Sequence, residues 1–169
     1  MNIITPEEMR IGVVPGPKLV TLISCRSDEK PNIVTVSYVG QITDRLMYIS
    51  LRPSRYSNSL IRHSKKFGIN YISSNLVKEA DYCGIYSGKN TDKLKVTGLT
   101  VDDSNLINET SLSLECSLKD IKKIGEHDVF FGKVTKAVKR KEEYDWLYHD
   151  NFEYFSKRGS LGKLFEVGR

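Results

Sequence analysis

Two polar segments of this chain combine cationic side chains with serine hydroxyls at close spacing. Residues 50–58 read Ser-Leu-Arg-Pro-Ser-Arg-Tyr-Ser-Asn, and residues 87–89 read Ser-Gly-Lys. Arginine offers a planar fork of donors and lysine a point charge, and both suit an anion. The first segment also leads from an apparent strand into an apparent helix. Because a helix start presents free N–H groups and partial positive charge, the pattern predicts a pocket for a phosphorylated small molecule.

The candidate phosphate contacts are the three cations and four serines of these segments. They are Ser50, Arg52, Ser54, Arg55, Ser57, Ser87 and Lys89. Two alternatives to phosphate binding stay open. The arginines and serines of this turn could simply be exposed to solvent, or one of the two arginines could form a salt bridge at a subunit interface. Arg52 directly precedes Pro53, which favours extended backbone at Arg52.

Other ligand classes find little support in the sequence. Residues 84–89 have the wrong spacing for a P-loop, and Asn90 stands where serine or threonine would hold magnesium. The absence of G-x-G-x-x-G argues against a Rossmann dinucleotide fold. His63 and His149 are far from each other and from any cysteine pair, so we expect no metal site.

Length and composition indicate one soluble domain spanning residues 1–169, with 39% apolar and 28% charged residues. No apolar run is long enough for a membrane span, and the first residues do not resemble a signal peptide. Three scattered cysteines, Cys25, Cys83 and Cys116, favour buried free thiols in a reducing compartment. We therefore expect a cytoplasmic protein with no membrane contact.

The net charge of +5 is compatible with anionic ligands or with nucleic acid. The densest cationic run, residues 133–141, has Val134 and Val138 between its charges. This spacing favours the wet face of a strand over a nucleic-acid site, so we expect no nucleic-acid partner.

The apolar patterning predicts a mainly β protein built from antiparallel hairpins, which suits a closed barrel better than a doubly wound sheet. The expected strands are residues 18–25, 32–39, 46–51, 67–72, 111–124 and 127–138. A helix capped by Ser54 or Ser57 should follow the third strand, with Leu60 and Ile61 on its inner face. Ser74 should cap a second short helix, and residues 84–108 read as a polar loop.

Seven short motifs in order resemble the flavin reductase-like, FMN-binding split-barrel family, in particular its flavoredoxin branch. The motifs are Pro15-Gly-Pro17, Pro31-Asn-Ile-Val-Thr-Val-Ser-Tyr38, Ser50-Leu-Arg-Pro-Ser-Arg-Tyr-Ser57, Phe67-Gly-Ile-Asn70, Asp81-Tyr-Cys-Gly84, Ser87-Gly-Lys89 with Asp92-Lys93, and His127-Asp-Val-Phe-Phe-Gly-Lys-Val134. The resemblance covers a core of about residues 10–138 and, more loosely, an aromatic-rich tail at residues 142–169.

The resemblance implies a six-stranded antiparallel Greek-key split barrel with short flanking helices, assembled as a homodimer with FMN near the subunit interface. It implies that residues 50–57, with Lys89, hold the ribityl phosphate. It also implies that Thr35, Val36, Ser37 and Tyr38 border the isoalloxazine ring, and that His127 lies near the flavin face where a nicotinamide would stack.

Three functions remain open under this resemblance. The first is an NAD(P)H:flavin oxidoreductase, and the second is an FMN-bound electron carrier served by a redox partner protein. The third is a non-redox FMN-binding module. The tail matches the family only loosely, so its aromatic residues are expected either in the core or a dimer contact, or as a lid over the flavin.

Overall fold

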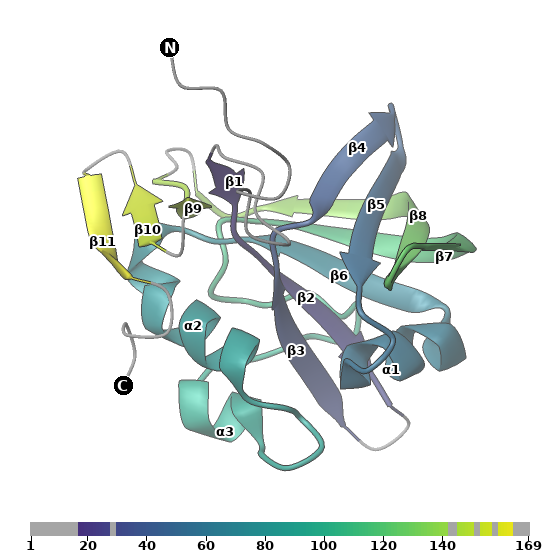
Figure 1. Cartoon of the computed structure of the whole chain (residues 1–169), viewed down its shortest axis with the longest axis horizontal. Coiled ribbons are helices and arrows are strands. Elements are labelled where there is room, and N and C mark those ends of the chain that lie inside the picture. The colour runs from purple at the N-terminus through teal and green to yellow at the C-terminus, as the bar shows by residue number, and fades with distance from the viewer. Residues whose placement is uncertain (1–16, 28–29, 142–144, 151–152, 157–158, 164–169) are drawn as a thin grey trace.

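The computed structural model describes residues 17–27, 30–141, 145–150, 153–156 and 159–163. Within these ranges the chain forms a curled seven-stranded sheet, a smaller four-stranded sheet and three α-helices (Figure 1). The mainly β, antiparallel architecture predicted from the sequence is confirmed. Among the described helices, none is long and apolar enough to cross a membrane.

The large sheet contains seven antiparallel strands in the order β3-β2-β6-β7-β8-β5-β4. Their bounds are Thr21–Arg26 for β2, Pro31–Val36 for β3, Val39–Thr43 for β4, Leu46–Leu51 for β5, Lys66–Tyr71 for β6, Leu112–Ile124 for β7 and His127–Lys139 for β8. The long β7–β8 hairpin turns at Gly125, whose φ of 57° is a left-handed value that glycine adopts without steric cost.

Strands β3 and β4 follow each other in the chain, yet they lie at opposite ends of the strand order. Only Ser37 and Tyr38 separate them. The sheet must therefore curl until its two ends meet at this junction. The backbone N–H of Ser50, on β5, donates to the carbonyl of Tyr38 at 2.9 Å and ties the junction to the far end of the sheet.

This junction corrects the strand prediction for residues 32–39. The strand ends at Val36, because the chain has to cross to the other end of the sheet before it resumes as β4. Strand β4 was not predicted, so the sheet has seven strands where six were expected. Its last three residues are exposed, and the strand carries no apolar alternation, which explains why the sequence pattern missed it.

Alternate residues of β2 and β3 face two different hydrophobic clusters. Ile23 and Val34 point into the barrel, whereas Leu22 and Ile33 pack against a second cluster beneath α2. Burial on both faces explains why these strands are nearly continuous apolar runs rather than alternating ones. All three cysteines are free and buried, as predicted.

Three α-helices connect or flank the strands: α1 (Tyr56–Ser64), α2 (Val77–Ile85) and α3 (Lys93–Thr97). Leu60 and Ile61 of α1 are buried, as predicted, but its N-cap is Arg55 rather than Ser54 or Ser57, and no side chain caps it. A 3-10 turn, η1 (Ser74–Leu76), precedes α2, and Ser73 rather than Ser74 is its N-cap. The hydroxyl of Ser74 donates instead to Asp145.

Helix α3 lies inside the segment expected to be a loop. Asp92 caps it by accepting from the N–H of Lys95 at 3.1 Å, and Gly98 ends it with a left-handed φ of 71°. These are ordinary start and stop residues. The helix is only five residues long, which is too short to show an apolar period in the sequence.

The C-terminal tail contributes strands β9 (Tyr148–Asp150), β10 (Glu153–Ser156) and β11 (Gly159–Lys163), which join β1 (Lys18–Leu19) in the small sheet. Tyr154 is fully buried in the cluster beneath α2, and its hydroxyl donates to Asp81 at 3.3 Å. The sequence left open whether the tail aromatics pack in the core or a dimer contact, or cover the flavin. Tyr154 packs in the core. Tyr144 and Phe152 lie outside the described residues.

A charged network fixes α1 to the barrel at the start of β8. The buried carboxylate of Asp128 accepts from the Asn58 amide and pairs with Arg62, both at 2.8 Å. Arg62 also donates to the Asn58 side-chain oxygen at 2.9 Å, which closes the network. These donors lower the pKa of Asp128, because they stabilise its ionised form.

We expect Asp128→Asn to lower the free energy of unfolding at pH 7 by about 1.5–3 kcal/mol, the range for hydrogen bonds to charged groups. Since the folded pKa is below the unfolded value, the stabilisation is complete above about pH 4 and is lost as pH falls further. Urea unfolding from pH 7 to pH 3 should therefore show a smaller acid-induced loss in the variant. The control is Asp103→Asn at an exposed position. An equal loss in both variants would contradict this role.

Candidate functional site

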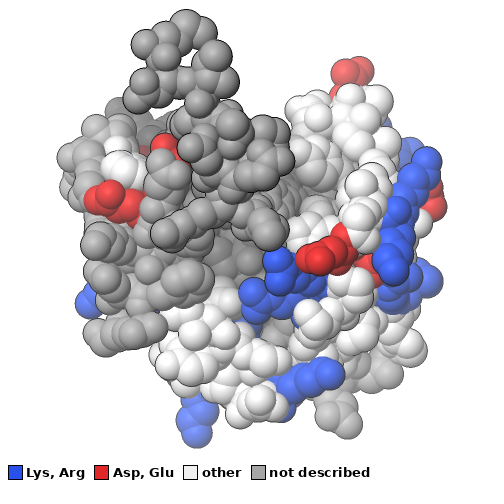
Figure 2. All heavy atoms as spheres, viewed as in Figure 1, with Lys and Arg blue, Asp and Glu red and all other residues white. Residues whose placement is uncertain are grey.

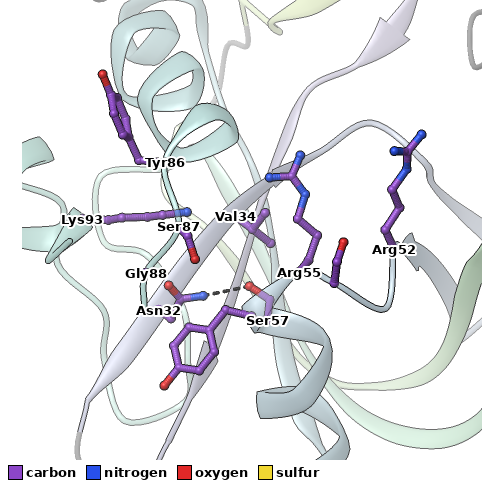
Figure 3. Close-up of a pocket in the computed structure, with 11 residues that line it drawn as sticks. Asn32, Val34, Arg52, Arg55, Ser57, Tyr86, Ser87, Gly88 and Lys93 are labelled. Carbon is purple, nitrogen blue, oxygen red and sulfur yellow. Dashed lines mark hydrogen bonds between the residues drawn. The ribbon is translucent and has the colours of Figure 1, made fainter. Parts of the chain in front are cut away.

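A pocket of about 230 Å³ opens between the start of α1 and the segment after α2. It brings together residues from four parts of the chain (Figure 3). The lining residues are Asn32, Val34, Arg52, Ser54, Arg55, Tyr56, Ser57, Tyr86, Ser87, Gly88 and Lys93. Drug-sized ligands occupy cavities of about 300–1,000 Å³. This pocket is smaller, so it suits one end of a ligand such as a phosphate group.

Five of the seven predicted phosphate contacts line this pocket, and they come from both predicted segments. Arg52, Ser54, Arg55 and Ser57 belong to the turn into α1, and Ser87 belongs to the segment after α2. Segments thirty residues apart in the sequence thus meet around one cavity. The sequence predicted that both segments contribute to one phosphate pocket, from their residue types, the expected helix start and the motif order.

Arg55 holds the two walls of the pocket together. It is the N-cap of α1, and its guanidinium donates to the carbonyl of Gly84, near the end of α2, at 3.2 Å. Because one guanidinium has five N–H donors, this bond leaves others for an anion in the pocket. The positive end of the α1 dipole adds to the same field.

The floor of the pocket is polar and closely packed. The amide of Asn32 donates to the buried Ser57 hydroxyl oxygen at 2.8 Å (Figure 3). The backbone of Gly88 comes so close that a Cβ atom there would lie 1.8 Å from the Asn32 side-chain oxygen. A side chain at this position would push Asn32 away from its bond with Ser57, so Gly88 helps to preserve the shape of the pocket floor.

Lys93 belongs to one of the seven motifs but was not among the predicted phosphate contacts, and it lines the pocket. Its side chain is only 5% exposed, and its ammonium donates to the carbonyls of Ile33 at 2.7 Å and Cys83 at 2.8 Å. Burial lowers the pKa of Lys93, and the nearby charge of Arg55 lowers it further. The sequence signal for Lys93 was the preceding residue, Asp92. Aspartate is a common helix N-cap, and here it places Lys93 at the first position of α3.

The pocket has an excess of positive charge. Arg52, Arg55 and Lys93 line it, and none of its described lining residues carries a carboxylate. Among the described residues, no carboxylate pairs with the Lys93 ammonium, although a buried charge without a counter-ion is costly. In the space-filling view, cationic side chains gather near the middle of the face shown (Figure 2). The donor set therefore fits a phosphate.

Two predicted contacts, Lys89 and Ser50, do not line the pocket. The Lys89 ammonium lies 5.8 Å from the centre of the Tyr56 ring, in a cation–π position at the pocket's edge. Ser50 is on β5, where its backbone contacts Tyr38. Inside the cavity, a buried cation is present at Lys93, the first residue of α3.

The residues predicted to border a flavin ring lie around the β3–β4 junction. The exposed Tyr38 ring lies 5.7 Å from the ring of His127, with the planes tilted by 50°. Ser37 forms a hydrogen bond with His149, on β9. By contrast, Val36 is a core residue, and the Thr35 hydroxyl donates to the carbonyl of Ala80. Within this group, Ser37, Tyr38 and His127 are therefore the better candidates for ligand contact.

The comparison with known proteins agrees with this arrangement. Residues 16–157 match the flavin reductase like domain family. The chain belongs to this family. Membership supports a flavin-binding redox function and confirms the resemblance predicted from the seven motifs.

Solved structures of the flavin reductase-like fold superpose on nearly the whole chain. A flavoredoxin from Methanosarcina acetivorans has a TM-score of 0.82 at 21% identity, covering 100% of this chain and 98% of its own. An FMN-binding protein from Thermus thermophilus, with bound p-hydroxybenzaldehyde, has a TM-score of 0.76 at 18% identity, covering 90% and 94%. An NADH:FAD oxidoreductase from Streptomyces globisporus has a TM-score of 0.78 at 15% identity, covering 91% and 96%.

We expect inorganic phosphate to protect the ligand-free protein against thermal unfolding, because an anion that binds only the folded state stabilises it. Lys93→Met should weaken phosphate binding by about tenfold or more, as expected for a lost charge-assisted hydrogen bond. The matched control is Lys95→Met, an exposed lysine of the same helix. Melting curves over a phosphate series measure both effects. Equal protection of both variants would remove Lys93 from the anion site.

Proposed function

We propose that this protein binds FMN and transfers hydride or electrons through it, as a flavin reductase-type oxidoreductase. The observation that carries the proposal is the buried Lys93 ammonium, which faces a cavity lined by two arginines and by no described carboxylate. A dianionic phosphate is the counter-ion that this cavity lacks. The Tyr38–His127 pair provides an aromatic surface for the ring that such a phosphate would carry.

The protein's own contribution is positioning and electrostatics. Bound FMN would supply the redox chemistry, because its ring accepts and releases electrons and hydride. Arg52, Arg55 and Lys93 would hold the phosphate, and the hydroxyls of Ser54 and Ser87 would complete its hydrogen bonds. His127 would contact the ring or the reductant from the start of β8.

The reductant distinguishes the enzyme from the carrier. In the enzyme, NADH or NADPH reduces the flavin, which then reduces a free flavin or another small acceptor. In the carrier, FMN stays bound and electrons come from a redox partner protein. The printed names of the neighbours include both kinds, a flavoredoxin and an NADH:FAD oxidoreductase. Steady-state consumption of NAD(P)H supports the enzyme, whereas tight FMN without turnover supports the carrier or a non-redox FMN-binding module.

We favour FMN over riboflavin because the pocket offers three cations to a phosphate group, which riboflavin lacks. The Thermus neighbour, by its name an FMN-binding protein, agrees with this preference. A cytoplasmic location stays a prediction, consistent with the three buried free thiols.

Arg55→Ala should weaken FMN binding by about tenfold to a hundredfold, because a charge-assisted contact to phosphate contributes roughly 1.5–3 kcal/mol. Fluorescence titration with FMN and riboflavin measures the effect. Riboflavin lacks the phosphate, so its affinity should barely change and the preference for FMN should shrink. Arg45→Ala, at an arginine outside this pocket, is the control. Equal losses for both flavins would assign Arg55 to the fold, and failure of the wild type to bind FMN would refute the proposed function.

His127→Ala should leave FMN affinity near the wild-type value and slow reduction of the bound flavin by NAD(P)H. Removing one positioned polar group typically costs about 10- to 1,000-fold in rate. Stopped-flow absorbance of the flavin band measures the reduction directly. An unchanged rate would leave His127 as a packing partner of Tyr38.

The protein should form a homodimer, the assembly that the family resemblance implies. Sedimentation velocity at micromolar concentration, with FMN bound, tests this expectation. A monomer that retains FMN would show that one subunit suffices for the site.

A further inference from the structure

His149 connects the C-terminal sheet to the β3–β4 junction. Its Nε2 atom lies 2.6 Å from the Ser37 hydroxyl oxygen, across 112 positions of sequence. His149 is on β9, where it pairs with Lys18 of β1 and Tyr154 of β10. The hydrogen bond therefore links the small sheet to the segment that closes the barrel.

Ser37 lies in the two-residue junction between β3 and β4, beside the aromatic pair proposed to contact the flavin ring. It directly precedes Tyr38, whose ring contacts His127 and whose carbonyl is fixed by Ser50. The backbone at Ser37 is thus held by the barrel closure, whereas its hydroxyl is oriented, among the described residues, by the bond to His149. A hydroxyl has one donor hydrogen and two lone pairs, so its partner decides which of these remains for a ligand.

We propose that His149 is a positioning residue, which orients the Ser37 hydroxyl and so sets the hydrogen bond that this hydroxyl offers to the edge of a bound flavin ring. This inference rests on the proposed flavin-binding function. In this proposal the tail does not cover the flavin as a lid would. It acts through one side-chain contact, the hydrogen bond between His149 and Ser37. Oxidised and reduced flavins differ in their ring N–H groups, so the orientation of the hydroxyl affects their relative affinities.

The surroundings of His149 favour its neutral form. Burial lowers its pKa and the Lys18 charge lowers it further, while Asp150 opposes both effects. Glu153 lies on the neighbouring strand opposite Asp150, and the buried Tyr154 opposite His149 has a raised pKa and stays un-ionised. A neutral ring has one accepting nitrogen, whereas the protonated ring has only donors. Acidification would therefore force the His149 ring to donate and would leave the Ser37 hydrogen for the ligand.

The test is the midpoint potential of bound FMN in wild type, His149→Phe and His149→Gln, measured from pH 8 to pH 5. One neutral hydrogen bond corresponds to about a three- to tenfold change in equilibrium. We expect His149→Phe to change the ratio of reduced to oxidised FMN affinity by that factor at pH 8. His149→Gln should restore much of the ratio, because its amide can bond the hydroxyl. The wild type alone should show an added pH dependence below about pH 6.5.

A double-mutant cycle with Ser37→Ala isolates the contact. In that background His149→Phe should have no further effect on the potential. His63→Phe, the same change at an exposed position of α1, is the matched control and should leave the potential at its wild-type value. An unchanged potential in His149→Phe with FMN still bound, or an effect that persists without the Ser37 hydroxyl, would overturn the inference alone. Loss of FMN binding by the wild type would overturn it together with the proposed function.

Discussion

The closure of the large sheet at Ser37 and Tyr38 is the constraint on which the rest of the structure depends. Two consecutive strands, β3 and β4, lie at opposite ends of the strand order, so two residues must span the seam of the barrel. The bond from Ser50 to the Tyr38 carbonyl holds that seam. Because the seam is fixed, the start of β8 comes beside it, and Tyr38 meets His127. The candidate ring-binding surface thus follows from the topology.

The pocket that we propose for the phosphate depends on charge and burial instead. Two of its cations are held by backbone carbonyls rather than by described carboxylates: Lys93 by Ile33 and Cys83, and Arg55 by Gly84. Carbonyl partners satisfy the N–H donors but leave the positive charge uncompensated. The pocket consequently attracts an anion more strongly than an array of ion pairs would. The buried carboxylate of Asp128 does not line this pocket and is paired with Arg62 of α1.

The sequence predicted the elements with strong apolar patterns and the residues with distinctive chemistry. The β7–β8 hairpin, the inner face of α1 and the juxtaposition of Arg55 with Ser87 could all be predicted from local pattern or motif order. Strand β4 and helix α3 could not, because β4 is largely exposed and α3 is too short to show a period. Lys93 was quoted in a motif but not predicted as a phosphate contact, because its burial could not be read from residue type. Lys89, which was predicted, lies outside this pocket, so residue type alone does not determine which cation faces a cavity.

Substitutions would have different effects at the two ends of the proposed site, the phosphate pocket and the β3–β4 junction. The phosphate end is built from residues whose loss removes charge or disrupts packing, such as Lys93 and Gly88, so substitutions there change affinity. The ring end depends on hydroxyl and aromatic groups at a seam, where orientation matters more than charge. The small sheet reaches this seam through His149 and Ser37. Under the proposed function, a substitution in that sheet would therefore change the environment of a bound ring while leaving the phosphate pocket intact. One part of the chain would then set how tightly the ligand is held, and another how its ring behaves.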